Sequence, residues 1–149
     1  MKNIIIKKAS KNNIPVVLGL LYELGRPRPQ NNSESGRFES KVRKYLSDTD
    51  KQILVAKLNG NVIGVVSIMF LSRLNRKTSE MYVPELVIAK NHQGKSIGRN
   101  VIEHCIVLAT KKKCHRIRLE SGNQRISSHE FYRKMGFEQS ALSFTKNLS

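Results

Sequence analysis

The stretch Tyr82-Val-Pro-Glu-Leu-Val-Ile-Ala-Lys-Asn-His-Gln-Gly-Lys-Ser-Ile-Gly-Arg-Asn-Val-Ile-Glu-His-Cys-Ile-Val-Leu-Ala109 decides how the chain folds. Its apolar first part, 83–89, is typical of a buried β-strand. A polar turn with Gly94 and Gly98 follows. Apolar residues then recur at helical spacing, at Ile97, Val101, Cys105 and Leu108. We therefore predict a strand, a glycine-containing loop and a helix.

Such a strand-to-helix loop is a favourable place for an anion. The first N–H groups of a helix have no partner inside it, and the aligned peptide dipoles add positive potential there. Lys95 and Arg99 flank the loop and add formal charge. We expect a phosphorylated ligand here, although an ordinary strand-to-helix turn would show the same local pattern.

Length and composition indicate one globular domain over residues 1–149, with 39% hydrophobic residues. The two cysteines lack the spacing of a redox or metal site, and the four histidines have no metal-ligand partners at useful spacing, so we expect no metal. The longest apolar run, 62–71, is too short to cross a bilayer, and Lys7-Lys8 closes the apolar run at the N-terminus. We therefore expect a cytoplasmic protein that does not enter a membrane.

The formal net charge of +16 favours anionic partners. A nucleic acid is one such partner, but the chain has no recognisable helix-turn-helix, zinc finger or aromatic RNA-binding sequence. We do not favour it. Bound ligands that are themselves anionic would account for the charge as well.

Ten elements are expected in the order β-α-α-β-β-β-α-β-α-β. The expected strands are residues 2–9, 52–58, 62–71, 83–89, 116–121 and 137–148. The expected helices are residues 14–24, 34–46, 97–109 and 127–135. Asn59-Gly60-Asn61 is a hairpin signal between two strands. We predict an α/β fold with one mixed central sheet and helices on both faces.

Two residues of strand 83–89 stand out. Pro84 cannot donate to a strand ladder, so it indicates a strand start, an edge or a bulge. Glu85 is the only carboxylate of this apolar strand. It either faces solvent, pairs with a nearby lysine, or acts as a general base.

Two motifs together resemble the GNAT family of N-acetyltransferases. The loop Gln93-Gly94-Lys95-Ser96-Ile97-Gly98 is similar to the family's cofactor loop, and Phe131-Tyr132 followed by Gly136-Phe137 is similar to its second signature. Ser96 departs from the pattern, because the family usually has glycine there. A positive φ would cost serine roughly 1 kcal/mol. We expect a negative φ, with the hydroxyl capping the helix or bonding a phosphate oxygen.

Within this family, several segments resemble the aminoalkylphosphonate N-acetyltransferases. These are Glu85-Leu-Val, Arg125 with His129, Gly136-Phe-Glu-Gln-Ser and Phe144-Thr-Lys. The resemblance implies transfer of acetyl from acetyl-CoA to a primary amine by direct attack in a ternary complex. The acceptor would be a small molecule such as an aminoalkylphosphonate, a polyamine or an aminoglycoside-like amine.

The resemblance also implies roles for individual residues. Glu85 would be the base, directly or through water, and Tyr132 would protonate the leaving thiolate. Acetyl-CoA would contact Leu86, Val87, Ile88, Gln93, Gly94, Lys95, Ser96, Ile97, Gly98 and Arg99. Arg99 or the run 111–113 would meet the 3′-phosphate on the adenine side of the cofactor. Tyr22, Tyr45 and Arg37 are candidates for the acceptor pocket.

Three other functions stay open. One is a protein lysine or N-terminal acetyltransferase, although basic peptides usually suit acidic grooves and this chain has only 11 acidic residues. Another is a basic nucleic-acid-associated module without catalysis. The third is a related domain that binds the cofactor but does not catalyse. The chain would act as a monomer or, through an exposed sheet edge near its last expected strand, as a homodimer.

Overall fold

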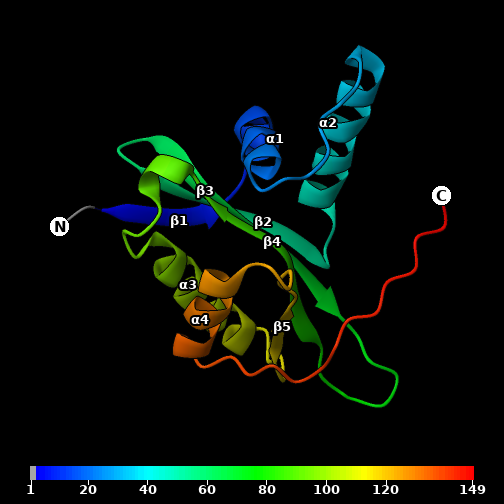
Figure 1. The fold of residues 1–149 in the computed structure, drawn as a ribbon, viewed down its shortest axis with the longest axis vertical. Helices are drawn as coiled ribbons and strands as arrows, with labels where there is room; N and C mark the ends of the chain where they lie inside the picture. Colours follow the sequence, from blue (N-terminus) through cyan, green and yellow to red (C-terminus); the bar gives the residue numbers. More distant parts are fainter. Residues whose placement is uncertain (1–2) are drawn as a thin grey trace. The chain divides into compact units, whose positions relative to one another are not determined.

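The computed structural model describes residues 3–149, and its regular elements follow most of the expected order (Figure 1). The strands are β1 Ile4–Lys8, β2 Lys51–Leu58, β3 Asn61–Leu71, β4 Glu80–Ile88 and β5 Ile117–Leu119. The α-helices are α1 Ile14–Glu23, α2 Asn32–Ser47, α3 Ile97–Lys111 and α4 Ile126–Lys134. Two single 3-10 turns, η1 Lys11–Asn13 and η2 Lys90–His92, precede α1 and α3. Residue 2 of the first expected strand lies outside the described residues.

One sheet contains the strands in the order β1-β2-β3-β4-β5. The first four are antiparallel neighbours. β5 comes beside β4 after a crossover through α3, the kind of connection that parallel strands require. The Met81 N–H donates to the Arg116 carbonyl across these two strands at 3.0 Å. The predicted mixed sheet is confirmed.

Helices cover both faces of the sheet, because its central strands are apolar at nearly every position. β3 is buried over six consecutive residues, 63–68, and such a run needs cover on both sides. Figure 1 shows α1 and α2 on one side and α3 on the other. The α1 and α2 side packs around Ile14, Val17, Leu20, Val42, Ile53, Val55, Val65 and Val87. The α3 helix buries Ile97, Val101, Ile102, Cys105 and Ala109.

The hairpin between β2 and β3 forms at the predicted place. Asn59 and Gly60 both have positive φ angles, 52° and 82°. Two such residues in a row give the turn whose twist matches that of the flanking strands. This turn fixes the register of β2 against β3.

The chain divides into two compact units, and the boundary falls after Arg118. The second unit, 119–149, contains α4 and ends in a segment without helix or strand. The predicted strand 137–148 is therefore wrong. Its alternating apolar residues Leu142, Phe144 and Leu148 are 71–90% exposed, and alternation alone does not form a strand without a pairing neighbour.

The other elements differ from the predicted ones only at their ends. β5 is shorter than the predicted 116–121, while β4 and α2 begin earlier than predicted. In the described residues, no helix has both the length and the hydropathy needed to cross a bilayer.

Candidate active site

A bulge interrupts β4 at Pro84. Ser67 of β3 lies opposite Glu85 and Met69 lies opposite Tyr82, so β4 uses one residue more than β3 over this step. Proline has no N–H to give to the ladder, and an extra residue without a partner is the local solution. Such a bulge re-aims the side chain that follows it, which here is Glu85.

The Glu85 carboxylate is held by two side chains. The Ser67 hydroxyl donates to Oε1, and the Arg26 Nε–H lies 3.4 Å from Oε2. Arg26 also donates through Nη2 to the Pro84 carbonyl at 3.3 Å, and the Glu85 N–H donates to the Ser67 Oγ at 3.0 Å. The Glu85 side chain is 23% exposed. It is therefore a fixed carboxylate that a ligand from solvent can still reach.

Tyr45 adds a protonated phenol near this carboxylate. Its hydroxyl donates to the Ile68 carbonyl at 3.1 Å. Burial raises the pKa of Tyr45 first, and the negative charges of Glu85 and Asp48 raise it further, while a hydrogen bond with Ser67 lowers it. The phenol therefore keeps its proton at neutral pH. The structure thus brings one of the three predicted acceptor-pocket residues close to Glu85.

The other two predicted acceptor residues make contacts of their own. The Arg28 guanidinium lies 5.1 Å from the centroid of the Tyr22 ring, which is within the range of a cation–π interaction. Arg37 donates through Nη1 to the Ser33 Oγ at 2.9 Å within α2. Arg26 and Arg28 come from the loop after α1, so this loop brings positive charge to the protein's surface.

The C-terminal half of β4 has one open edge. Residues 86–88 stay in register with residues 64–66 of β3. On the other side β5 begins beside Met81 and is only three residues long, so it can pair only with the first part of β4. Among the strands of the described part, none pairs with that edge of β4 at 85–88. An extended ligand could hydrogen-bond there.

The loop between β4 and α3 turns through two positive φ angles. The Gln93 side chain donates to the Ile88 carbonyl at 3.0 Å and closes the end of the strand. Gly94 has a φ of 77° and Ser96 has a φ of 64°. The α3 helix then begins at Ile97, and the first N–H groups of the helix have no acceptor within it.

The expected negative φ of Ser96 is wrong. Ser96 is the residue before α3 and lies in the left-handed region, and its side chain makes no capping hydrogen bond. Only four residues, 93–96, connect η2 to α3, and Gly94 in the same turn also has a positive φ. Serine therefore carries a strain that glycine would not have at this position.

The two cations expected at this loop behave differently. Lys95 is exposed in the loop. The Arg99 Nε–H bonds the Glu103 carboxylate at 3.1 Å, one turn along α3, and both side chains are more than half exposed. Lys95 is therefore the basic side chain of the loop itself, whereas the charge of Arg99 is shared with Glu103.

Tyr132 lies on α4 in the second unit. Its ring packs edge-to-face against Phe131 and Phe137, with centroids 5.2 and 5.7 Å apart. Gly136 ends the helix as predicted, with a φ of 91°. Burial raises the pKa of Tyr132, and the charge of Arg125 lowers it. The net shift is upward, so this phenol is also protonated at neutral pH.

Sequence reasoning missed two residues of the Glu85 cluster. Ser67 is a buried serine in an otherwise apolar strand, and that exception was the available signal. Arg26 reaches Glu85 from 59 positions away in the chain, and no sequence pattern indicates this contact.

The chain is similar in sequence to proteins of known family. The model of the acetyltransferase (GNAT) family matches residues 19–137. The chain is 24% identical to the aminoalkylphosphonate N-acetyltransferase of Salmonella typhimurium over 143 residues, which are 96% of this chain and 90% of that protein.

Solved structures share the fold. The glucosamine-6-phosphate N-acetyltransferase of Arabidopsis thaliana superposes with a TM-score of 0.82 at 18% identity, and 99% of each chain is covered. An aminoglycoside N-acetyltransferase in complex with CoA superposes with a TM-score of 0.84 at 13% identity, covering 99% of this chain and 96% of that one.

The strain at Ser96 predicts a stabilising substitution. Ser96→Gly should raise the free energy of unfolding by about 1 kcal/mol, because glycine adopts a positive φ without steric cost. Ser40→Gly, in the middle of α2, should instead lower it by roughly 0.5 kcal/mol. Urea unfolding of both variants measures these changes. Equal losses in the two variants would mean that Ser96 is not strained.

Proposed function

The chain belongs to the GNAT family of acetyltransferases and is an acetyl-CoA-dependent N-acetyltransferase, and we propose that its acceptor is the primary amine of a small molecule. The observation that carries this proposal is the fixed, partly exposed Glu85 carboxylate at the β4 bulge. It offers an ammonium group both a counter-charge and a base. We further propose that residues 1–149 work as one acetyltransferase domain, since the family match at 19–137 crosses the boundary between the two units.

Acetyl-CoA, when bound, supplies the thioester carbonyl that the amine attacks. We propose that Leu86, Val87, Ile88, Gln93, Gly94, Lys95, Ser96, Ile97, Gly98 and Arg99 hold it. The unpaired N–H groups at the start of α3, together with Lys95, suit a pyrophosphate. The open edge of β4 suits an extended chain with amide groups.

Glu85 would remove the ammonium proton, which otherwise prevents the amine nitrogen from acting as a nucleophile. An alkylamine with a pKa near 10.4 is only about 0.04% neutral at pH 7, so a nucleophile must first be made. With acetyl-CoA bound, Glu85 would take one proton from the ammonium group, directly or through water, and the neutral amine nitrogen could then attack the carbonyl carbon. Backbone N–H groups of residues 86–88 would stabilise the charge that develops on the carbonyl oxygen.

Arg26 indicates how the acceptor would enter. Its guanidinium stands against Oε2 of Glu85, where the ammonium group of an acceptor would also be stabilised. The ammonium group of an incoming acceptor would therefore replace the Arg26 guanidinium as the ion-pair partner of Glu85. Because the Arg26 side chain is already about half exposed, moving it away from Glu85 would expose little further buried surface.

Tyr132 would complete the reaction. As the carbon–sulfur bond breaks, the leaving thiolate needs a proton, and the phenol gives it. The upward pKa shift of Tyr132 keeps that proton available at neutral pH. The nitrogen would lose its second proton as the amide forms, and that proton would restore the Tyr132 phenol through water. Glu85 would return the first proton to solvent, so the products are the amide, free CoA and one proton.

An aminoalkylphosphonate is the acceptor class that we favour. The Salmonella typhimurium relative is named for this class. Arg28 and Arg26, near the Tyr22 and Glu85 side chains, offer charge to an anionic group on the acceptor. Polyamines and aminoglycoside-like amines are the alternatives among small molecules. A protein lysine or N-terminal acceptor is less suited, because Lys and Arg outnumber Asp and Glu by 27 to 11.

An acceptor panel tests the proposed function. Release of CoA thiol should be fastest with short aminoalkylphosphonates, and a polyamine, an aminoglycoside and a lysine peptide serve as comparisons. The anionic acceptor should have the highest kcat/KM. A lysine peptide that outperforms every small amine would overturn the proposed acceptor class.

Glu85→Gln should lower kcat/KM at pH 7 by about 10²-fold, because the amine then depends on its small neutral fraction. The loss should shrink as the pH rises toward the amine pKa. The exposed Glu138→Gln serves as the matched control and should leave the rate unchanged. If the pH–rate profile of Glu85→Gln from pH 6 to 9 equals that of the unmodified enzyme, Glu85 is not the base.

Tyr132→Phe should lower kcat by roughly 10- to 100-fold, because it removes the proton donor and keeps the ring packing. The dissociation constant for acetyl-CoA should stay within about twofold. Steady-state kinetics and calorimetry give the two quantities separately. Unchanged turnover would remove the proton-donor role.

A further inference from the structure

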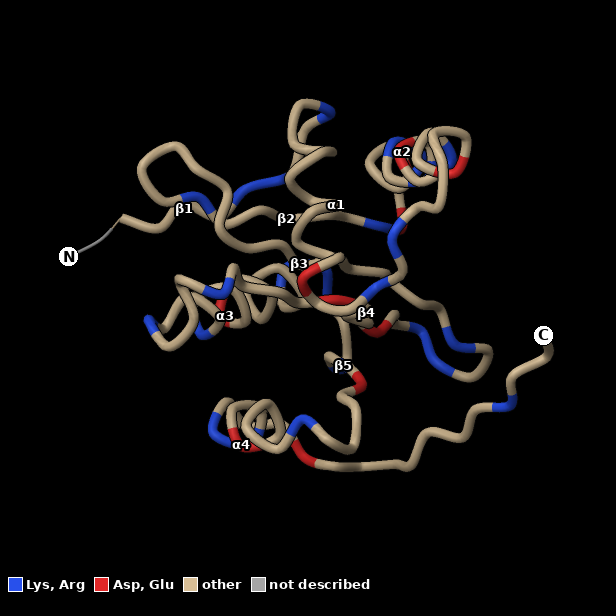
Figure 2. The backbone as a smooth tube through the Cα atoms, turned by 45° about the horizontal axis from the view of Figure 1, so that its top comes forward, with Lys and Arg blue, Asp and Glu red and all other residues tan. Residues whose placement is uncertain are grey.

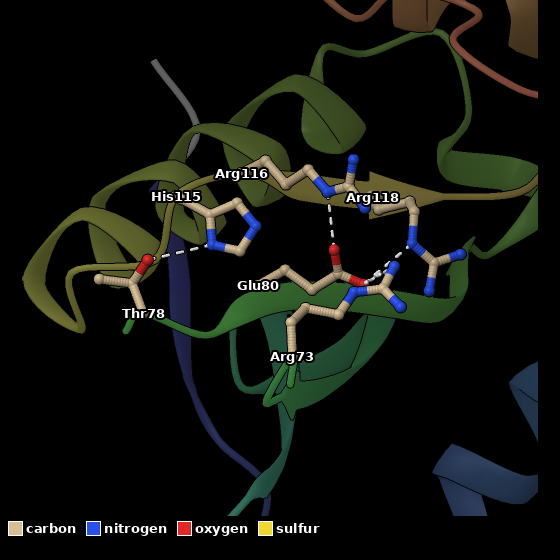
Figure 3. A network of polar contacts seen from close by, with 6 residues as sticks. All are labelled: Arg73, Thr78, Glu80, His115, Arg116 and Arg118. Carbon is tan, nitrogen blue, oxygen red and sulfur yellow. Dashed lines mark hydrogen bonds and ion pairs between the residues drawn. The ribbon is translucent and has the colours of Figure 1, made fainter. Parts of the chain in front are cut away.

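Two carboxylates of β4, Glu80 and Glu85, contact arginine side chains in different ways. Glu80 is 0% exposed, and three arginines contact it at 2.6 to 3.4 Å (Figure 3): Arg116, Arg118 and Arg73. Glu85 is 23% exposed, and in the described part of the chain Arg26 is the one basic side chain within ion-pair distance of it. A fully buried carboxylate cannot lose its partners without leaving a buried charge. The pair at Glu85 is the one that a ligand could exchange.

The contact between Arg26 and Glu85 is loose. The Nε and Oε2 atoms are 3.4 Å apart, whereas strong charge-assisted hydrogen bonds are about 2.7–2.9 Å long. Such half-exposed pairs contribute little to stability. Arg26 has a second hold on the site, because its Nη2 donates to the Pro84 carbonyl at 3.3 Å. The guanidinium could therefore release Glu85 and stay at the bulge.

The backbone that carries Arg26 is fixed by the end of α1. Gly25 has a φ of 101°. Its N–H donates to the Tyr22 carbonyl at 3.0 Å, and the Arg26 N–H donates to the Leu21 carbonyl at 3.1 Å, which is the hydrogen-bond pattern of a Schellman motif. Pro27 follows and restricts Arg26 to extended conformations. A change of partner at Arg26 thus needs only side-chain rotation, and the ordering cost of binding is low.

An acceptor that carries only an ammonium group gains little at this site. Its ammonium would take Oε2 of Glu85 from Arg26, so one ion pair breaks and one forms. The guanidinium, still held at the Pro84 carbonyl, would then lie beside a second positive charge. Like charges this close repel each other. The site therefore disfavours simple alkylamines.

An acceptor with a nearby anionic group avoids this repulsion. Its ammonium would pair with Glu85 and its anion with Arg26, so one ion pair breaks and two form. A guanidinium can donate more than one N–H to the oxygens of a phosphonate. Because Nε and Oε2 are only 3.4 Å apart, the two charges of the acceptor must also lie close together. The three bonds of N–C–C–P, at roughly 1.5 Å each, give a suitable spacing.

We propose that Arg26 is a specificity-determining residue, which gives up Glu85 to the ammonium group of the acceptor and binds the acceptor's anionic group. The site then selects short amines that carry a phosphonate-like anion about two carbon atoms from the nitrogen. This inference rests on the proposed function and adds to it the residue that selects the acceptor.

Two acceptors that differ only in charge test the exchange. They are 2-aminoethylphosphonate and its dimethyl ester, which has the same carbon chain and amine but no negative charge. Arg26→Gln should lower kcat/KM for the phosphonate about 10- to 100-fold, because it removes a charge-assisted hydrogen bond. It should raise kcat/KM for the ester about threefold or more, because the competing cation is gone. If Arg26 only held Glu85 in place, both values would fall.

Three controls accompany this comparison. Arg26→Lys keeps the charge without the planar fork, so it should retain part of the preference for the phosphonate. Arg76→Gln removes the same charge from an exposed position in the loop before β4, and it should leave both values within about twofold. With 4-aminobutylphosphonate, whose charges are further apart, the loss in Arg26→Gln should be smaller than with the two-carbon acceptor.

A change in the same direction for both acceptors, or an unchanged ratio of their kcat/KM values, would overturn the proposal in an Arg26→Gln variant that thermal unfolding shows to be folded. If the unmodified protein released CoA with no amine at all, the proposed function would fail separately. Calorimetric titration with 2-aminoethylphosphonate then decides the role of Arg26. Binding that Arg26→Gln weakens about tenfold supports it, whereas absent or unaffected binding contradicts it.

Discussion

Pro84 is the constraint on which the candidate active site depends. Because it has no N–H, the ladder between β3 and β4 cannot continue through it, and the extra residue of the bulge follows. The bulge turns Glu85 toward Ser67 and Arg26. The rest of β4 then leads directly into the loop before α3. One proline thus determines where the carboxylate faces and separates the paired half of the strand from the half with an open edge.

The charge of the protein has a structural explanation as well. Lys and Arg are spread along most of the chain in place of one basic tail (Figure 2). Basic residues stand, among other places, in the loop after α1 and in the loop before α3. We expect charge that is scattered in this way to suit small anionic ligands better than one continuous polyanion.

Much of the fold could be predicted from the sequence, because local rules decide it. The Asn59-Gly60 turn, the buried run of β3 and the helical spacing of α3 each follow from a few adjacent residues. The predictions that were wrong or missing depend on contacts between segments that are distant in the sequence. Strand 137–148 was predicted from alternation, but the structure has neither helix nor strand in that segment. The positive φ of Ser96 and the contact of Arg26 with Glu85 depend on how distant segments meet.

We propose that this chain binds acetyl-CoA at the loop between β4 and α3 and uses it for acetyl transfer. Calorimetric titration with acetyl-CoA in moderate salt, with CoA and ATP as comparison ligands, tests it most directly. We expect saturable binding near one molecule per chain, selective over ATP, and much weaker in Lys95→Gln. Absence of saturable binding, or equal binding of ATP, would contradict it, and the strained Ser96 would then mark a loop that no longer holds the cofactor.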